Sequence, residues 1–310
     1  MSLLRQPLLA LSRSAAVKKL ATTLPVSSGI VARYVPGEST GQVLKTVANL
    51  QAAGLRTSVD HLGEDTLDLA QAEATVRAYE EVLAASANRG LAQLGEVSVK
   101  LTAIGLALDD GEQVALANAR RICRAARNAG AQVTVDMEDH TATDVTLQIV
   151  KALRADFPDT GAVIQAYLHR SEDDCRALAE EGSRVRLCKG AYAEPADVAF
   201  TEPHQVDLAY VRCLKVLMKG AGYPMLATHD PRMIAVGAAL ARSAGRRRGQ
   251  YEFQMLYGIR PEEQRRLVAE GETMRVYVPY GREWYGYLMR RLAERPQNLS
   301  LFVKSLVSKT

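Results

Sequence analysis

Cysteine is scarce in this chain, and its spacing excludes two common uses of the residue. The 310 residues include four cysteines, Cys123, Cys175, Cys188 and Cys213, and no two of them form a CxxC pair. The sequence therefore supports neither a zinc centre nor a disulfide framework, and no metal site is predicted. A reduced, cytoplasmic setting is the simplest expectation.

Long apolar runs and dense basic runs are missing too. The leucine-rich N-terminal segment is interrupted by Arg5, Gln6 and Pro7, and no apolar run of about 18 residues follows it. We expect an amphipathic helix there, which leaves peripheral association with the inner face of the cell membrane open. The net charge of +4 is mild, and the densest basic cluster, 246–248, lies between two glycines. No nucleic-acid partner is expected.

The chain does contain a regular alternation of short strand-like runs with longer helical ones. The strand-like runs are 56–61, 97–103, 132–138, 162–168, 184–190, 224–230, 251–257 and 274–280. The helical stretches, with apolar residues at 3.6-residue spacing, are 66–89, 112–129, 142–156, 172–181, 204–220, 231–243, 260–271 and 283–295.

Eight strands, each followed by a helix, predict an α/β fold of the (βα)8 TIM-like barrel type. The rival is a doubly wound open sheet, which favours a GxGxxG turn after an early strand, and the sequence has none. We expect an N-terminal helical extension over 1–55, the barrel over 56–296, and a C-terminal tail or helix over 297–310.

Polar residues stand within or just after almost every predicted strand, where a strand buried on both faces should be apolar. They are Lys100, Asp136, Gln165, Tyr167, Arg170, Arg186, Lys189, Thr228, His229, Gln254 and Tyr277. Interior ion pairs are one explanation, with Asp136 and Lys100 the obvious pair. Their shared position favours an active site at the C-terminal ends of the strands.

The last helical stretch carries two adjacent arginines, Arg290 and Arg291, with Glu294 one turn further on. Two guanidiniums about 100° apart around a helix axis could clamp a small carboxylate, although such a pair often faces solvent. Across the predicted site, the cations Lys100, Arg186, Lys189, Arg290 and Arg291 outnumber the carboxylates Asp136 and Glu294. This balance favours an anionic ligand or intermediate.

Several motifs together resemble the proline dehydrogenase family. VSVKLTA, VDMED, VIQAYLHR, VRLCKGAY, ATHD, EFQMLYG and VYVPYG…YLMRRLAE occur in the order and approximate spacing of that family, over about 56–296. The resemblance implies a distorted barrel whose final helix caps the site, and FAD bound without a Rossmann domain. It also implies oxidation of L-proline to Δ1-pyrroline-5-carboxylate by hydride transfer to flavin N5, and electron transfer to a membrane quinone. A homo-oligomer is compatible with the sequence.

The resemblance implies a substrate site. Its substrate-binding residues are Lys100, Leu256, Tyr277, Arg290, Arg291 and Glu294, and Tyr192 helps to wall the ring. Arg290 and Arg291 take the proline carboxylate with help from Lys100. Asp136 keeps Lys100 charged and positioned. Its other assignment, as a general base toward the proline nitrogen, stays open, although a neighbouring lysine makes a carboxylate a weaker base.

The resemblance also implies a cofactor site. Its residues are Met137, Gln165, Arg186, Lys189, Gly190, Ala191, Tyr192, Thr228, His229 and Gln254. Arg186 lies near flavin N5, where positive charge stabilises the reduced flavin, and it forms the catalytic centre with Asp136. Two departures stand out: Asp230, where the family often has Asn, and Ala193, where many relatives have Trp.

Two other functions fit parts of this pattern. A Schiff-base aldolase would use Lys100 or Lys189 as its nucleophile in a barrel. A non-catalytic anion-binding or membrane-surface module would use the basic residues together with the N-terminal helix. Flavin absorbance of the purified protein separates these functions from the first.

Overall fold

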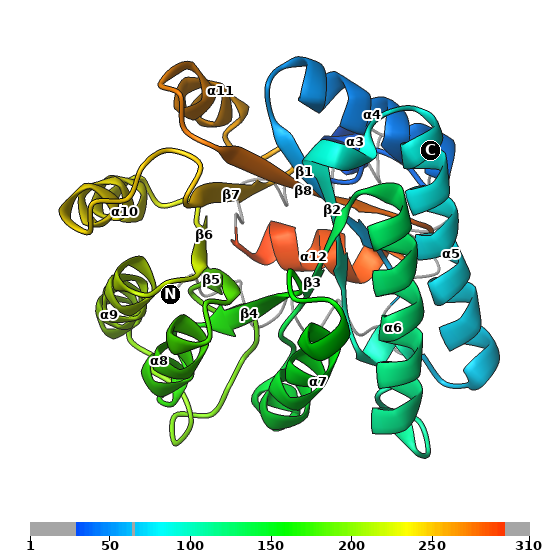
Figure 1. Cartoon of the computed structure of the whole chain (residues 1–310), viewed down its shortest axis with the longest axis horizontal. Coiled ribbons are helices and arrows are strands. Elements are labelled where there is room, and N and C mark those ends of the chain that lie inside the picture. Colours follow the sequence, from blue (N-terminus) through cyan, green and yellow to red (C-terminus); the bar gives the residue numbers. More distant parts are fainter. Residues whose placement is uncertain (1–28, 64–65, 295–310) are drawn as a thin grey trace, which may run out of the picture.

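The computed structural model describes residues 29–63 and 66–294, and eight parallel strands close into a barrel within them (Figure 1). Each strand pairs with the next along the chain, and the last pairs with the first. The strands are β1 Arg56–His61, β2 Gly95–Val99, β3 Gln132–Val135, β4 Gly161–Gln165, β5 Arg184–Cys188, β6 Tyr223–Ala227, β7 Glu252–Leu256 and β8 Met274–Tyr280. The predicted TIM-like barrel is confirmed.

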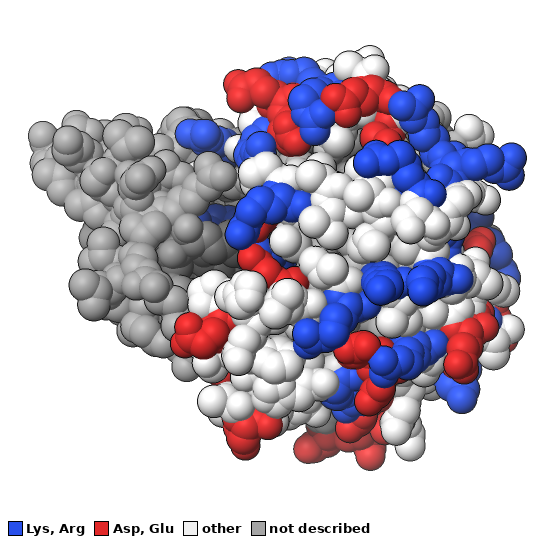
Figure 2. All heavy atoms as spheres, turned by 90° about the vertical axis from the view of Figure 1, so that its left-hand side faces the viewer, with Lys and Arg blue, Asp and Glu red and all other residues white. Residues whose placement is uncertain are grey.

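Helices follow the strands and surround the barrel. They are α5 Leu69–Asn88, α6 Gly111–Ala129, α7 Thr143–Asp156, α8 Ser171–Glu180, α9 Pro203–Lys219, α10 Pro231–Ser243 and α11 Pro261–Ala269, with short 3-10 turns at Ala92–Leu94, Thr102–Ile104 and His140–Ala142. In the described part of the chain, no helix is long and apolar enough to cross a membrane. On the flank formed by α9 and α10, basic and acidic side chains are interspersed (Figure 2).

The helix after β8 departs from this pattern. α12, Trp284–Glu294, lies across the ring of strands instead of beside it (Figure 1). Its buried Trp284 and Leu288 pack with Val31 and Tyr34, which belong to α3, Gly29–Tyr34. A preceding helix, α4 Thr40–Ala52, packs instead against β1 and β8 in the outer layer. The final helix therefore covers the mouth of the barrel.

Local sequence signals set several of these boundaries. Ser39 and Gln42 form a capping box at the start of α4. Asp230 caps α10 by accepting the backbone N–H of Arg232, and Pro231 occupies the first helical turn. α6 ends at Gly130, whose φ of 77° places it in the left-handed region that glycine adopts without strain.

Two of the eight predicted strands, 56–61 and 274–280, have the observed bounds, but the other six continue too far. β2 ends at Val99 and not at residue 103, and β3 ends at Val135 and not at residue 138. Some ladder bonds continue past these ends, as when the Asp136 N–H donates to the Val99 carbonyl at 2.8 Å. The chain then turns into loops, so Lys100 and Asp136 lie just after their strands, at the mouth. Other polar residues assigned to strands do lie within them, namely Gln165, Arg186, Gln254 and Tyr277.

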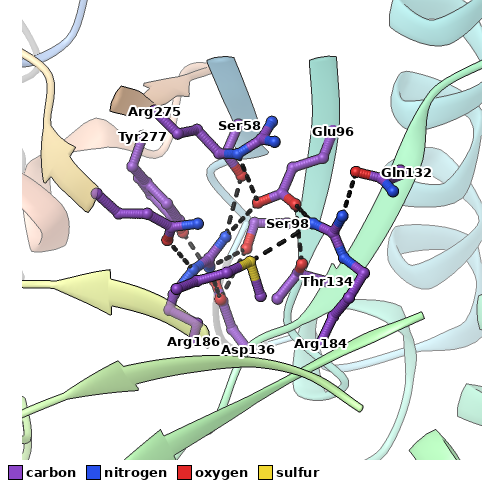
Figure 3. A network of polar contacts seen from close by, with 12 residues as sticks. Ser58, Glu96, Ser98, Gln132, Thr134, Asp136, Arg184, Arg186, Arg275 and Tyr277 are labelled. Carbon is purple, nitrogen blue, oxygen red and sulfur yellow. Dashed lines mark hydrogen bonds and ion pairs between the residues drawn. The ribbon is translucent and has the colours of Figure 1, made fainter. Parts of the chain in front are cut away.

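Side chains alternate between the two faces of the strands, as the pleat requires. In β2, Val97 and Val99 face the helices and belong to the main hydrophobic core, whereas Glu96 and Ser98 face the lumen. In β8, Val276 and Val278 pack outward in the same way. Figure 3 shows the inward-facing polar groups pointing toward one another. The stabilising apolar layer thus lies outside the barrel, and the lumen is polar.

Arg275 is the most deeply buried cation of the lumen, at 1% exposure. Its Nε lies 2.6 Å from Glu252 Oε1, and its Nη1 donates to the Thr57 carbonyl at 2.9 Å. Burial alone would raise the pKa of Glu252, but the Arg275 guanidinium outweighs burial and lowers that pKa. The pair is therefore charged at neutral pH.

We expect the substitution Arg275→Met to lower the free energy of unfolding by about 3–5 kcal/mol, because it leaves the buried Glu252 carboxylate without its closest cation, and Arg56 lies 3.9 Å away. Urea denaturation measures the loss. Arg176→Met is the control, since Arg176 makes exposed ion pairs with Glu172 and Asp173, and exposed pairs contribute about 1 kcal/mol or less.

The same experiment has a pH dependence with a fixed sign. A carboxylate whose pKa is lowered in the folded state stabilises the fold above its ordinary pKa, and that stability is lost as the pH falls. The gap between wild type and Arg275→Met should therefore narrow below about pH 4. An equal gap at all pH values would contradict the assignment of the charged pair.

Candidate active site

A cavity of about 630 Å³ opens at the C-terminal ends of the strands. It gathers residues that lie far apart in the sequence, from Lys100 after β2 to Arg291 on α12. Fifteen of the seventeen predicted site residues line it: Lys100, Asp136, Met137, Gln165, Arg186, Lys189, Gly190, Ala191, Tyr192, Thr228, His229, Gln254, Leu256, Tyr277 and Arg291. The other two, Arg290 and Glu294, have side chains outside the described residues.

Arg186 lies at the inner end of this cavity and is bound from four neighbouring strands or strand ends (Figure 3). Its Nε donates to Gln254 Oε1 at 2.6 Å. Nη1 donates to Ser98 Oγ and to Asp136 Oδ1, both at 2.7 Å. Nη2 donates to Ser58 Oγ at 3.2 Å and to Glu96 Oε1 at 2.5 Å. All five N–H donors of the guanidinium therefore have a protein partner.

Asp136 accepts from three donors rather than from Lys100 alone. In addition to Arg186, Ser98 donates to its Oδ1 at 2.7 Å, and the Tyr277 hydroxyl donates to its Oδ2 at 2.8 Å. Burial, together with the neighbouring Asp136 carboxylate, raises the pKa of Tyr277 well above its ordinary value. Tyr277 therefore stays protonated and keeps donating.

The predicted pair of Lys100 with Asp136 is a secondary contact. Lys100 Nζ lies 3.8 Å from Asp136 Oδ2 but 2.8 Å from Asp60 Oδ2. Asp60, at the end of β1, is 1% exposed and was not among the predicted site residues. It is the closer counter-charge for Lys100, which changes the expected role of Asp136.

The expected excess of positive charge also needs correction. The sequence analysis weighed two carboxylates, but Asp60 and Glu96 face the lumen cations, and Asp207 and Asp230 both contact Lys189 at the rim. An available signal was overlooked: in β2 and β5, polar residues alternate at i, i+2, as Glu96 does with Ser98. The inner cavity is therefore nearly balanced in charge.

Lys189 sits at the rim of the cavity between two carboxylates. Its Nζ contacts Asp207 Oδ1 and, at 3.0 Å, Asp230 Oδ2, and Arg232 contacts the same two aspartates. The Arg232 guanidinium beside Asp230 holds the pKa of that carboxyl below its usual range, with a further contribution from Lys189. Asp230, one of the two departures from the family pattern, is therefore ionised.

The segment after β5 is held by side chains from neighbouring strand ends. Gln165 bridges two loops, because its Oε1 accepts the Ala191 N–H at 3.0 Å while its Nε2 donates to the Glu138 carbonyl at 2.7 Å. Tyr167 supports the same segment, since its hydroxyl accepts the Tyr192 N–H at 3.3 Å. Gln165 and Tyr167 thus shape the wall of the cavity.

His229 also has a defined orientation in the wall. Its Nε2 accepts the Leu256 N–H at 3.0 Å, so that nitrogen carries no proton in this arrangement. The neighbouring Thr228 Oγ1 accepts the Asp230 N–H at 3.1 Å and thereby fixes the turn into α10. Both residues line the cavity through contacts that also order their own loops.

The surroundings of Lys100 and Lys189 do not favour the aldolase alternative. A Schiff-base lysine must give up its proton to become a nucleophile. Asp60 lies 2.8 Å from Lys100, and two aspartates contact Lys189. Each lysine nitrogen is therefore engaged in ion pairs with carboxylates, an arrangement that does not suit attack on a carbonyl carbon.

Comparisons with known proteins agree with one another. A family model described as proline dehydrogenase matches residues 43–304. Proline dehydrogenase 1 of Bacillus subtilis strain 168 is 38% identical over 307 residues, which are 99% of this chain and 100% of that protein. A proline dehydrogenase of Deinococcus radiodurans is 39% identical over 278 residues, 89% of each chain.

A solved structure also has this fold. It is proline utilization A (PutA) from Bdellovibrio bacteriovorus, inactivated by N-propargylglycine, which matches with a TM-score of 0.79 at 28% identity. The match covers 89% of this chain and 33% of the PutA chain, so the chain spans about a third of that structure.

Gly190, in the cavity wall, offers a test of how tightly the wall is built. Its φ is 136°, and a Cβ there would lie 2.5 Å from the Tyr167 ring. We expect Gly190→Ala to lower the free energy of unfolding by about 2–4 kcal/mol, as the sum of backbone strain and overpacking. In the control, Gly130→Ala, φ is also positive but no atom lies within 4 Å, so only the strain of about 1–2 kcal/mol remains. Equal losses would contradict a close packing of the wall against Tyr167.

Proposed function

The chain belongs to the proline dehydrogenase family, and we propose that it oxidises L-proline to Δ1-pyrroline-5-carboxylate with FAD as cofactor and a quinone as electron acceptor. The observation that carries the proposal is the single cavity shared by Lys100, Arg186 and Arg291. Lys100 and Arg291 can bind the carboxylate of proline, and the buried Arg186 guanidinium can stabilise the reduced flavin ring.

The lining of the cavity suits a flavin. Apolar side chains, Met137, Val163, Ala227, Met255 and Leu256, form walls for a planar ring. Arg186, at the inner end of the cavity, would place positive charge beside the flavin ring. Lys189, at the rim, would place positive charge beside the diphosphate. Lys189 would hold the diphosphate while it also pairs with Asp207 and Asp230. Bound FAD supplies a hydride acceptor; binding and orientation of proline are left to this chain.

In this proposal Lys100 and Arg291, which line the same cavity, bind the substrate carboxylate. Tyr277, Leu256 and Tyr287 also line this cavity and wall the five-membered ring in this proposal. Such fixation of the carboxylate matters because a displacement of about 1 Å at the reacting carbon can lower the rate by about 100-fold. Arg290 and Glu294 complete the clamp in this proposal.

Asp136 fits a positioning role better than that of a general base. Its carboxylate accepts from Arg186, Ser98 and Tyr277. Both of its carboxylate oxygens are therefore already engaged by donors of the protein. We therefore assign Asp136 to hold Arg186 and Tyr277 in place beside the substrate.

Anaerobic addition of L-proline to the purified protein tests the proposed function. The yellow flavin bands of the protein should bleach on addition of L-proline. A colourless protein that borohydride cross-links to a keto acid would instead favour an aldolase. Vesicle or anion binding without turnover of proline and a dye acceptor would favour a non-catalytic module.

Arg291→Met should raise KM for proline by about 10- to 100-fold, because a hydrogen bond between charged groups contributes about 1.5–3 kcal/mol. The flavin content of the purified variant should match that of the wild type. Steady-state kinetics with a dye acceptor measure the effect. Arg282→Met is the matched control, since Arg282 is exposed just before α12, and it should keep KM within about twofold of wild type. Loss of flavin from Arg291→Met would place that residue at the cofactor and contradict the assignment.

A further inference from the structure

Beneath the active-site cavity, charges of alternating sign form a column through the lumen. From the floor upward, the column is Glu252, Arg275, Glu96, Arg186, Asp136, Lys100 and Asp60. Successive charged atoms are 2.6, 4.0, 2.5, 2.7, 3.8 and 2.8 Å apart. Arg184 joins it from the side, with Nη2 3.0 Å from Glu96 Oε2. The four carboxylates and four cations of this group balance to zero.

A column of this kind needs an explanation other than stability. Barrel interiors are usually filled by layers of bulky aliphatic side chains. Buried ion pairs recover their desolvation energy only in part, and apolar replacements of similar volume are often as stable or more so. The lower half of this lumen is nevertheless charged, with Glu96 at 2% and Glu252 at 0% exposure.

Glu96 is the member of the column that joins the floor to Arg186. One carboxylate oxygen accepts from Arg186 Nη2, while the other accepts from Thr134 Oγ1 and Arg184 Nη2, both at 3.0 Å (Figure 3). Glu96, on β2, is therefore held by side chains of β3 and β5. Asp136 contacts the same guanidinium from the cavity side at 2.7 Å. Arg186 is thus fixed between one carboxylate inside the cavity and one beneath it.

We propose that Glu96, which does not line the cavity, is a positioning residue that fixes the Arg186 guanidinium and sets the charge presented to the cofactor. The inference rests on the proposed function, in which Arg186 faces the flavin ring. Glu96 acts in two separable ways. Its negative charge offsets the positive charge of Arg186. Its hydrogen bond with Arg186 Nη2 holds the guanidinium at the inner end of the cavity.

Glu96→Gln tests the charge. The amide keeps an oxygen acceptor for Arg186 but leaves the group with one uncompensated positive charge, which favours the reduced, more negative flavin. The equilibrium between oxidised and reduced protein-bound flavin should shift by about tenfold toward the reduced form, a rise of about 30 mV in the two-electron midpoint potential.

Glu252→Gln is the matched control. It also removes a fully buried carboxylate that pairs with Arg275, but Glu252 reaches Arg186 through intervening side chains such as Gln254, whereas Glu96 contacts Arg186 directly. Both variants should lose stability to urea, whereas the flavin equilibrium of Glu252→Gln should move less than about threefold. An equal shift in the two variants, or no shift in Glu96→Gln, overturns the proposal.

Glu96→Asp tests the contact and covers the case in which Glu96→Gln does not fold. Aspartate keeps the charge but withdraws the carboxylate by one methylene group. We expect kcat to fall by about tenfold or more with KM for proline within about twofold of wild type, since Arg186 moves while the carboxylate clamp does not. Wild-type kcat in Glu96→Asp overturns the positioning role.

The proposed function is tested separately by the wild-type protein. A wild-type protein that holds no flavin, or whose flavin L-proline does not reduce, refutes the proposed function and this inference together. A wild-type flavin that L-proline reduces, combined with unaltered Glu96 variants, refutes the inference alone.

Discussion

The Arg186 guanidinium has five N–H donors, and residues of the surrounding strands and strand ends accept every one of them. A buried guanidinium imposes this requirement, because a single unpaired charge in the lumen is far more costly than an unpaired neutral group. Meeting the requirement from several directions needs a closed barrel, in which strands that are distant in sequence face one another across the lumen. The fold and the site are therefore consequences of the same arrangement.

Because the charges in the lumen balance one another, positive charge for an anion has to come from elsewhere, and α12 supplies it through Arg291. Asp60, Asp136 and Glu96 outnumber Lys100 and Arg186 by one charge, so these groups alone present no net positive charge to an anion. Arg291 on α12 adds positive charge at the mouth. α12 can occupy that place because α4 packs against β1 and β8 in the outer layer. The final helix, which lies across the mouth, thus carries the cation that the proposed carboxylate clamp requires.

The sequence predicted the barrel well because short apolar runs and stretches of helical periodicity alternate along the chain. It predicted the site less completely, for two physical reasons. Strand ends were placed too late, since residues such as Asp136 keep one ladder bond after the strand has ended. Buried carboxylates were missed as well. Asp60 lies inside a strand-like run, and Glu96 lies directly before one because β2 begins at Gly95 and not at residue 97. In neither case does sequence position show which partner neutralises the carboxylate. Proximity across the lumen is set by closure of the barrel, and no local pattern encodes it.

The apolar shell explains how such a lumen is tolerated. Val97, Val99, Val276 and their neighbours pack against the helices, and each buried aliphatic side chain contributes about 1.5–3 kcal/mol. The lumen therefore does not need to stabilise the fold, only to avoid unpaired charge. Its side chains can therefore hold the Arg186 guanidinium at the cavity. The charged column extends below Arg186 because Glu96 is itself paired with Arg184 and Arg275, and Arg275 is paired in turn with Glu252. A carboxylate outside the cavity, such as Glu96, can in this way affect chemistry inside it.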